Sequence, residues 1–195
     1  HFYRAHPTLK TAPYHEQYRA FVDDAFCWFG SRDTSLRPLG YECMEILLNA
    51  SPMQKAWARE KAPIHTRCPL PEDVALLQLK AFAPDVLWYD YHNGPLLRAI
   101  RDMIPSIRLV LGSVGSAIPH TDVWRNIDVV LSCAPEAVAR MSADGIRALH
   151  FNHGFDPDVL SRLKPGKPKR DMAFIGQLTR RTGFHLFREA VLERL

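Results

Sequence analysis

The run Val86-Leu87-Trp88-Tyr89 is apolar at every position. A strand with one face in water alternates apolar and polar residues, so a continuous run is typical of a strand that is covered on both faces. Two further runs, 107–111 and 129–131, also lack alternation, and a helix-length segment or a long loop joins each run to the next. Such connections favour right-handed crossovers between parallel strands. The sequence therefore predicts an α/β domain with a doubly wound, Rossmann-like, mostly parallel sheet over residues 1–160.

Apolar residues at steps of three and four, together with capping residues, predict the helices of this domain. Helices are expected at 14–30, 51–60, 72–82, 94–103 and 135–143. Two more strands are expected at 41–48 and 146–151. No good strand precedes Pro7, although domains of this class normally begin with one, so we expect the first strand to be missing.

The end of the chain has a different pattern. Residues 161–170 are basic and broken by prolines, which is typical of a linker. The apolar run 172–176 follows and leads through a polar turn into a helical segment. We therefore expect residues 171–195 to be the first strand and helix of a second, truncated domain. The chain also lacks an initiating Met, which indicates a trimmed start.

Composition excludes several classes of protein. The 195 residues are 47% hydrophobic and 24% charged, as in ordinary globular domains. No apolar run approaches the roughly 18–20 residues that span a bilayer, and the start has no signal-peptide pattern. The four cysteines stand far apart, which argues against a zinc site or a disulfide framework and favours a cytoplasmic location.

The net charge of +4 is unevenly distributed. Residues 161–195 carry a balance of +6, and residues 1–160 carry −2. A basic end suits nucleic acid, an anionic membrane or a phosphate-bearing ligand. Aromatic residues are not interleaved with these charges, so we expect a phosphate ligand or a solvated linker and no nucleic acid.

Polar residues follow the strands at the edge where open parallel sheets bind ligands. Asp90, His92 and Asn93 follow the first apolar run. Asp90 could act as a general base with His92 as its partner. Alternatively, Asp90 caps the next helix and His92 is solvated. His120, farther along the chain, is a second candidate base.

Small residues follow the second apolar run. Gly112, Ser113, Gly115 and Ser116 would allow a ligand to approach the backbone closely, or they form a simple flexible turn. As a dinucleotide fingerprint the segment fails, because the third glycine is absent and no helix follows at once. No group of residues has convincing metal-ligand spacing, so no metal is expected.

The 172–176 run ends in a glycine near two arginines. Gly176, Gln177, Arg180 and Arg181 would offer backbone N–H groups and guanidinium donors to a diphosphate at the start of a helix. The alternative is a loop with two solvated arginines.

Several segments together resemble the GT-B glycosyltransferases, particularly the spore-maturation-protein-like branch of the family-4 type. The segment Gln54-Lys55-Ala56-Trp57-Ala58-Arg59-Glu60 is the most specific. The resemblance is also carried by 39–42 with Asn49, 84–88, 111–119, 127–132, 155–157 and 174–176.

This resemblance implies transfer of a sugar from a nucleotide-sugar donor to a hydroxyl acceptor, which could be a saccharide, a protein or a small molecule. Residues 1–160 would bind the acceptor, and no cofactor besides the co-substrate is implied. The catalytic candidates are then Asp90, His92 and His120. The acceptor-binding candidates are Asn93, Gly112, Ser113, Gly115 and Ser116, and the donor-binding candidates are Gly176, Gln177, Arg180 and Arg181.

The chain also departs from the family pattern. The first strand with its glycine-bearing loop and the carboxylate-bearing loop that holds the donor sugar are missing, so we expect an incomplete catalyst that could form oligomers. Two alternatives stay open: a non-catalytic Rossmann-like or flavodoxin-like binding module, and a nucleotide-sugar epimerase-like protein.

Overall fold

The computed structural model describes residues 2–24, 29–61, 70–115, 118, 120, 122–164, 166 and 183–194, without the side chain of Phe184. The chain packs as two units, His1–Val159 and Leu160–Leu195, and each is considered by itself.

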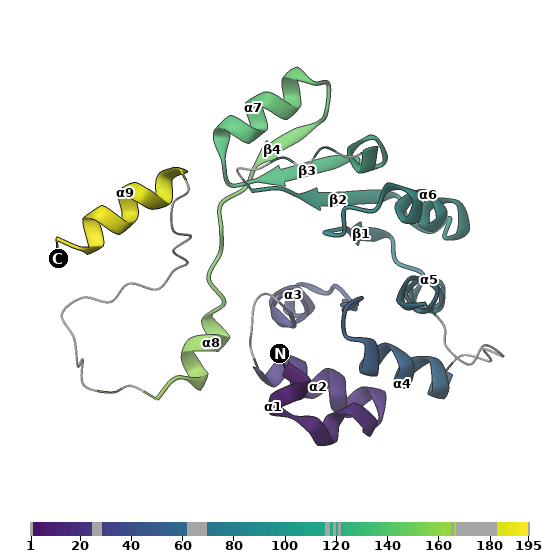
Figure 1. The fold of residues 1–195 in the computed structure, drawn as a ribbon. Helices are drawn as coiled ribbons and strands as arrows, with labels where there is room; N and C mark the ends of the chain where they lie inside the picture. Colours follow the sequence, from purple (N-terminus) through teal and green to yellow (C-terminus); the bar gives the residue numbers. More distant parts are fainter. Residues whose placement is uncertain are drawn as a thin grey trace. The chain divides into compact units, whose positions relative to one another are not determined.

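A four-stranded parallel sheet forms the centre of the first unit (Figure 1). Its strands are β1 (Val86–Trp88), β2 (Leu109–Ser113), β3 (Val129–Ser132) and β4 (Ala148–His150). They lie side by side in chain order, and each pairs in parallel with the next. The predicted α/β class with a parallel sheet is therefore confirmed, and the sheet is consistent with a Rossmann-like fold. A doubly wound sheet has a point at which the strand order reverses, and the described strands contain no such reversal.

The helices predicted at 94–103 and 135–143 are confirmed by α6 (Gly94–Met103) and α7 (Pro135–Ala143). A 3-10 helix, η3 (Asp122–Asn126), connects β2 to β3 and was not among the predicted helices. The start of α6 is set locally: Asn93 accepts a hydrogen bond from the Leu96 N–H at 3.0 Å, and Pro95 occupies the first turn. Both features stabilise a helix N-terminus, because a helix has no internal acceptors for its first N–H groups.

The core lies on one face of the sheet. The strand registers place Leu87, Val110, Val130 and Ala148 on this face. Helices α6 and α7 cover it with fully buried or nearly buried side chains: Leu97, Ile100 and Met141. Burying each such side chain contributes about 1.5–3 kcal/mol. This packing stabilises the sheet and holds its carboxyl edge in place.

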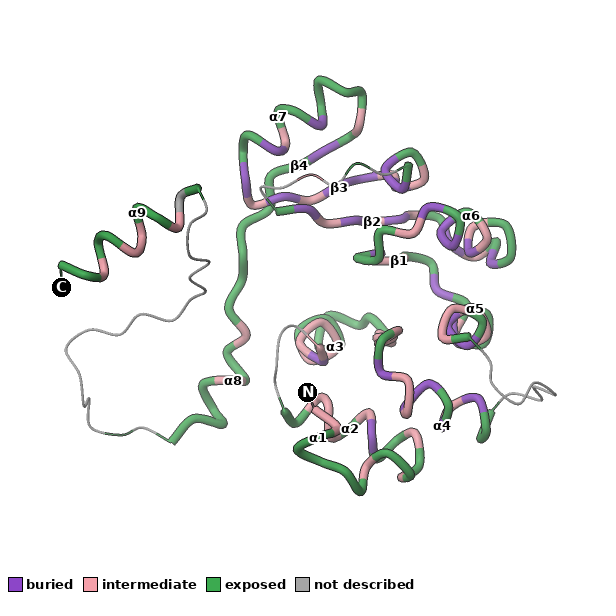
Figure 2. Tube along the Cα trace, viewed as in Figure 1, coloured by how far each residue is buried: buried purple, intermediate pink, exposed green. Residues whose placement is uncertain are grey.

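The opposite face of the sheet is only partly covered. Val86, Leu149 and Phe151 alternate with the core residues and are 50%, 47% and 51% exposed (Figure 2). The expectation that both faces are covered is thus wrong for this face. The reason is that the crossover segments between the described strands pack on the core side.

Short helices precede the sheet in the first unit. In chain order they are α1 (Phe2–Ala5), η1 (Pro7–Thr11), α2 (Tyr14–Asp24), α3 (Ser31–Leu36), η2 (Arg37–Leu39), α4 (Ser51–Lys61) and α5 (Pro71–Phe82). Phe2 stacks on Phe21 with ring centroids 3.9 Å apart. Gln17 is fully buried, accepts a hydrogen bond from the Tyr3 hydroxyl at 2.5 Å and donates to the Ala12 carbonyl at 2.7 Å. These contacts tie the start of the chain to α2.

The predicted helices at 51–60 and 72–82 are confirmed by α4 and α5. The helix expected at 14–30 is confirmed as far as Asp24, but its predicted end is wrong, because residues 29–30 form a turn. The expected strand at 41–48 is wrong: residues 41–47 have no regular structure, although Ile46 packs against the core. β1 bonds only to β2 among the described strands, so this segment has no strand to pair with.

Two strands begin later than expected. β2 starts at Leu109. The N–H groups of Arg108 and Leu109 both donate to the Asp85 carbonyl, so the regular alternation of hydrogen bonds with β1 begins only at this point. β4 spans Ala148–His150. In the described part of the chain no strand precedes β1, and the strand expected at 172–176 lies outside the described residues.

The second unit contains α9 (Gly183–Leu192), and α8 (Pro157–Arg162) spans the boundary between the units. α9 exposes Leu186, Phe187 and Val191. None of the described helices is both long and apolar enough to cross a bilayer.

Candidate functional site

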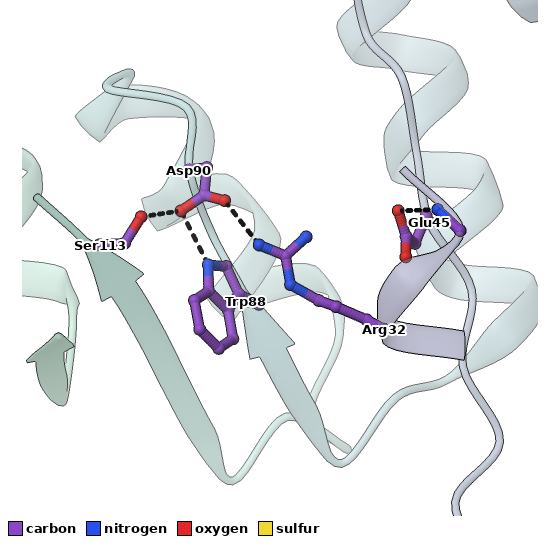
Figure 3. Close-up of polar contacts among 6 residues, drawn as sticks. Arg32, Glu45, Trp88, Asp90 and Ser113 are labelled. Carbon is purple, nitrogen blue, oxygen red and sulfur yellow. Dashed lines mark hydrogen bonds and ion pairs between the residues drawn. The ribbon is translucent and has the colours of Figure 1, made fainter. Parts of the chain in front are cut away.

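Four side chains meet at the carboxyl edge of the sheet, and we refer to them as the Asp90 cluster: Arg32, Trp88, Asp90 and Ser113 (Figure 3). Oδ1 of Asp90 accepts hydrogen bonds from the Trp88 indole N–H at 2.8 Å and from the Ser113 hydroxyl at 2.6 Å. Oδ2 forms an ion pair with the Arg32 guanidinium at 3.2 Å. One carboxylate thus joins two strand ends to α3.

The sheet geometry explains why Trp88 and Ser113 converge on Asp90. Parallel strands end at the same edge, and Trp88 of β1 pairs with Leu111, two residues before Ser113 of β2. Residues two apart in a strand lie on the same face. All of these residues belong to the partly covered face, so the Asp90 cluster borders the exposed side of the sheet.

Arg32 reaches the cluster from α3. Its Cζ atom lies 4.4 Å from the centre of the Trp88 ring. A guanidinium over an aromatic face is attracted to the negative π surface, typically by about 0.5–1 kcal/mol at an exposed site. The stacking sets the plane of the guanidinium, and its side chain remains 31% exposed.

A second carboxylate, Glu45, lies on the side of Arg32 that is away from Asp90 (Figure 3). Its Oε2 accepts a hydrogen bond from the Gly30 N–H at 3.0 Å. Its Oε1 is shielded from solvent and makes no hydrogen bond of ordinary length and angle to any residue that the structure describes. Burial raises the pKa of Glu45, because the charged form loses hydration, and the Gly30 N–H and the charge of Arg32 partly oppose the rise.

A pocket of about 450 Å³ opens beside the Asp90 cluster at the start of α6. It is lined by Asp90, Tyr91, His92, Asn93, Gly94, Pro95 and Asp122. The His92 ring lies 5.4 Å from that of Trp124, centre to centre. The Tyr89 hydroxyl donates to the Asn93 carbonyl at 2.7 Å, which holds the loop against the core. The pocket therefore combines carboxylate, imidazole and amide groups.

Asp122 closes the far side of the pocket. Its Oδ2 lies 2.6 Å from Arg98 of α6, and this hydrogen bond lowers the pKa of Asp122. A Cβ atom at Gly94 would collide with the Asp122 carboxylate, so a larger residue here would displace Asp122 from its present position. The contact brings η3 close to the start of α6.

The structure brings several predicted residues together. Asp90, His92 and Asn93 line the same pocket, and Ser113 bonds to Asp90. The alternative in which Asp90 caps the next helix is wrong, because Asn93 is the capping residue.

Other predicted residues have different surroundings. Gly112 packs against Ile127 in the core, whereas a Cβ atom at Gly115 would have no neighbour within 4 Å. His120 is exposed and does not line the pocket. Ser116, Gly176, Gln177, Arg180 and Arg181 lie outside the described residues.

Sequence reasoning missed Arg32 and Trp88 as site residues. Trp88 could have been found, because it lies two residues before Asp90 and so shares its side of the strand. Arg32 is 58 residues away from Asp90, and no local pattern connects them. The described residues include no group of three or more side chains that could hold a metal ion.

Comparisons with known proteins identify no relative. Neither a family model, nor a curated protein, nor a solved structure matches the chain.

Proposed function

We propose that this chain is the acceptor-binding part of a sugar transferase of the GT-B type. One observation supports the proposal most strongly: Asp90 lies at the carboxyl edge of a parallel sheet, beside a pocket that His92 and Asn93 also line. Open parallel sheets bind their ligands at this edge. Carboxylate, amide and imidazole groups hydrogen-bond well to hydroxyl groups, which are both donors and acceptors.

In the proposed reaction, an acceptor hydroxyl lies against Asp90. The carboxylate takes the proton as the acceptor oxygen bonds to the anomeric carbon of the donor sugar. The bond from that carbon to the diphosphate oxygen breaks, and its electron pair leaves with the nucleoside diphosphate. Positioned general-base catalysis of this kind typically contributes about 10²–10⁴-fold to a rate. His92 lies in the same pocket and is the second candidate for the base.

One observation favours the binding module as a second candidate function. In this structure both oxygens of Asp90 already accept hydrogen bonds, from Trp88 and Ser113 at Oδ1 and from Arg32 at Oδ2. Oδ2 has one lone pair left, which is enough to orient a ligand hydroxyl. These contacts hold the carboxylate in place, which suits a module that only binds a hydroxyl-bearing ligand.

Asp90→Asn tests the proposal. Nuclear magnetic resonance would measure binding of a panel of hydroxyl-bearing acceptors to the full chain, and transfer from nucleotide sugars would be assayed in parallel. We expect the variant to lose about tenfold or more in acceptor affinity, since a hydrogen bond to a charged group contributes about 1.5–3 kcal/mol. Any transfer by the wild type should fall about 10²-fold or more.

Asp102→Asn is the matched control, because Asp102 is exposed on α6 and does not line the pocket. It should behave as the wild type. Acceptor binding without any transfer would favour the binding module, and equal acceptor affinity in Asp90→Asn and the wild type would contradict both candidates.

A further inference from the structure

We propose that Arg32 binds a phosphate group of the ligand. When the ligand binds, the ion pair between Arg32 and Asp90 would break, and Arg32 would pair with the phosphate. The exchange would free Oδ2 of Asp90 for a ligand hydroxyl. The anion site itself follows from the Asp90 cluster, whereas the role of the freed oxygen rests on the proposed sugar transfer.

The first argument is the donor capacity of Arg32. A guanidinium carries five N–H donors in one plane and binds phosphate oxygens in pairs. Among the described residues, the Arg32 side chain makes one hydrogen bond, from Nη2 to Oδ2 of Asp90 at 3.2 Å. The Cζ atom of Arg32 lies over the Trp88 ring, and the side chain is 31% exposed, so part of the guanidinium is accessible to a ligand.

The second argument is the weakness of the present ion pair. The side chains of Arg32 and Asp90 are 31% and 40% exposed. Ion pairs between solvent-exposed side chains contribute only about 0–1 kcal/mol, so a ligand anion can replace one at little cost. The stacked ring would hold the guanidinium in position during the exchange.

The third argument concerns the neighbouring negative charge. Besides Asp90, the carboxylate that faces Arg32 is Glu45. Burial and the shielded Oε1 disfavour the charged form and raise the pKa of Glu45, so its repulsion of an incoming anion weakens as the pH falls. Asp33 of the same helix is paired with Arg37, whose Nη2 donates to both oxygens of the Asp33 carboxylate at 2.6 and 2.9 Å.

The exchange has a consequence for the proposed reaction. While Arg32 is bonded to Oδ2 of Asp90, an incoming hydroxyl has to share this oxygen with the guanidinium. A phosphate that takes Arg32 away would free Asp90 only when ligand is present. Arg32 is therefore a positioning residue for Asp90 as well as an anion-binding residue.

The Trp88 indole N–H reports directly on anion binding at Arg32, because it donates a hydrogen bond to Asp90 and the Arg32 guanidinium lies over the same ring. Its proton–nitrogen resonance, assigned with Trp88→Phe, would be followed in the full chain during titration with two probes. Pyrophosphate represents the diphosphate of a donor, and glycerol 3-phosphate represents a phosphorylated acceptor. Glycerol is the neutral reference.

We expect one of the two anions to shift the Trp88 resonance at a concentration where glycerol does not, and the responding probe identifies the source of the phosphate. Arg32→Gln should weaken this binding at least tenfold. Arg32→Lys keeps the charge but loses the planar donor edge, and should retain part of the affinity. Arg140→Gln is the matched control, because Arg140 is an exposed arginine of α7 outside the Asp90 cluster, and this variant should bind as the wild type.

The proposal is overturned if neither anion shifts the Trp88 resonance, or if folded Arg32→Gln binds them as the wild type does. Circular dichroism would establish that the variant is folded. Anion binding at Arg32 without any effect of Asp90→Asn on acceptors would keep the anion site and contradict the proposed sugar transfer. The reverse pattern, in which Asp90 matters and Arg32 does not, would contradict the anion site alone.

Discussion

The indole nitrogen of Trp88 lies 2.8 Å from Oδ1 of Asp90, although the two residues are only two apart in the chain. The side chains of β1 and of the loop that follows it therefore leave the sheet on the same side and meet. The same indole carries the Arg32 guanidinium on its ring. Trp88 thus contacts both charged groups of the Asp90 cluster, the Asp90 carboxylate through its N–H and the Arg32 guanidinium through its ring.

Trp88→Phe keeps an aromatic ring for Arg32 but removes the N–H donor to Asp90. We expect a loss of about 1 kcal/mol in the free energy of unfolding, because a hydrogen bond contributes about this much and the site is partly exposed. Urea unfolding would measure it. In an Asp90→Ala background the same substitution should cost only a few tenths of a kcal/mol, and an undiminished cost there would show that the hydrogen bond is not responsible.

Gly112 was a candidate ligand-binding residue, and the structure gives it a packing role. A Cβ at this position would lie 2.6 Å from Cδ1 of the buried Ile127. We expect Gly112→Ala to destabilise the protein by about 1–3 kcal/mol, the usual cost of overfilling a core. Thermal or urea unfolding would measure the loss.

Two further variants make this prediction specific. Ile127→Val removes the clashing Cδ1 atom and should cancel part of the cost in the double variant. Gly115→Ala is the matched control, because nothing lies within 4 Å of its Cβ position, and should change stability by about 0.5 kcal/mol or less. Equal losses at Gly112 and Gly115 would contradict the packing role.

Local sequence patterns predicted much of this fold for physical reasons. The helix at 94–103 was predictable because its capping residue Asn93 and Pro95 act within one turn. The parallel sheet was predictable from strands without alternation. The strand at 41–48 was wrong because pairing depends on a neighbouring strand, which no local pattern reports.

The candidate site was only partly predictable for the same reason. Asp90, His92 and Asn93 follow one strand, so their proximity is local. Arg32 and Glu45 come from segments far from Asp90 in sequence, and only the packing of the helices before the sheet brings them to the Asp90 cluster. The glycines after β2 could not be separated by sequence, since only packing distinguishes Gly112 from Gly115.

Glu45 predicts a pH dependence of stability. Its pKa is raised in the folded protein above the ordinary value of 4.5, so the folded state binds its proton more tightly than the unfolded state. The resulting stabilisation is fully present below about pH 4.5 and is lost as the pH rises through the raised pKa. Glu45→Gln resembles the protonated form and keeps an oxygen for the Gly30 N–H.

We therefore expect Glu45→Gln to gain stability relative to the wild type as the pH rises from 4 to 7, measured by urea unfolding at several pH values. Glu42→Gln is the control, because Glu42 is exposed, and its difference from the wild type should not vary in this way. A difference for Glu45→Gln that is constant across the range, or that shrinks as the pH rises, would contradict the raised pKa.

Ala83 ends α5 in the left-handed region, with φ of 51° and ψ of 58°, while its N–H donates to the Leu79 carbonyl at 2.8 Å. The Cβ atom makes this conformation unfavourable by about 1 kcal/mol, and glycine adopts it freely. We expect Ala83→Gly to raise the free energy of unfolding by about 0.5–1 kcal/mol. Ala81→Gly, the same change at an exposed position inside α5, should lower it by about 0.5–1 kcal/mol, because glycine is a poor helix former. Urea unfolding would measure the change in the free energy of unfolding for both variants. A loss of stability in Ala83→Gly would show that the left-handed end of α5 is not strained.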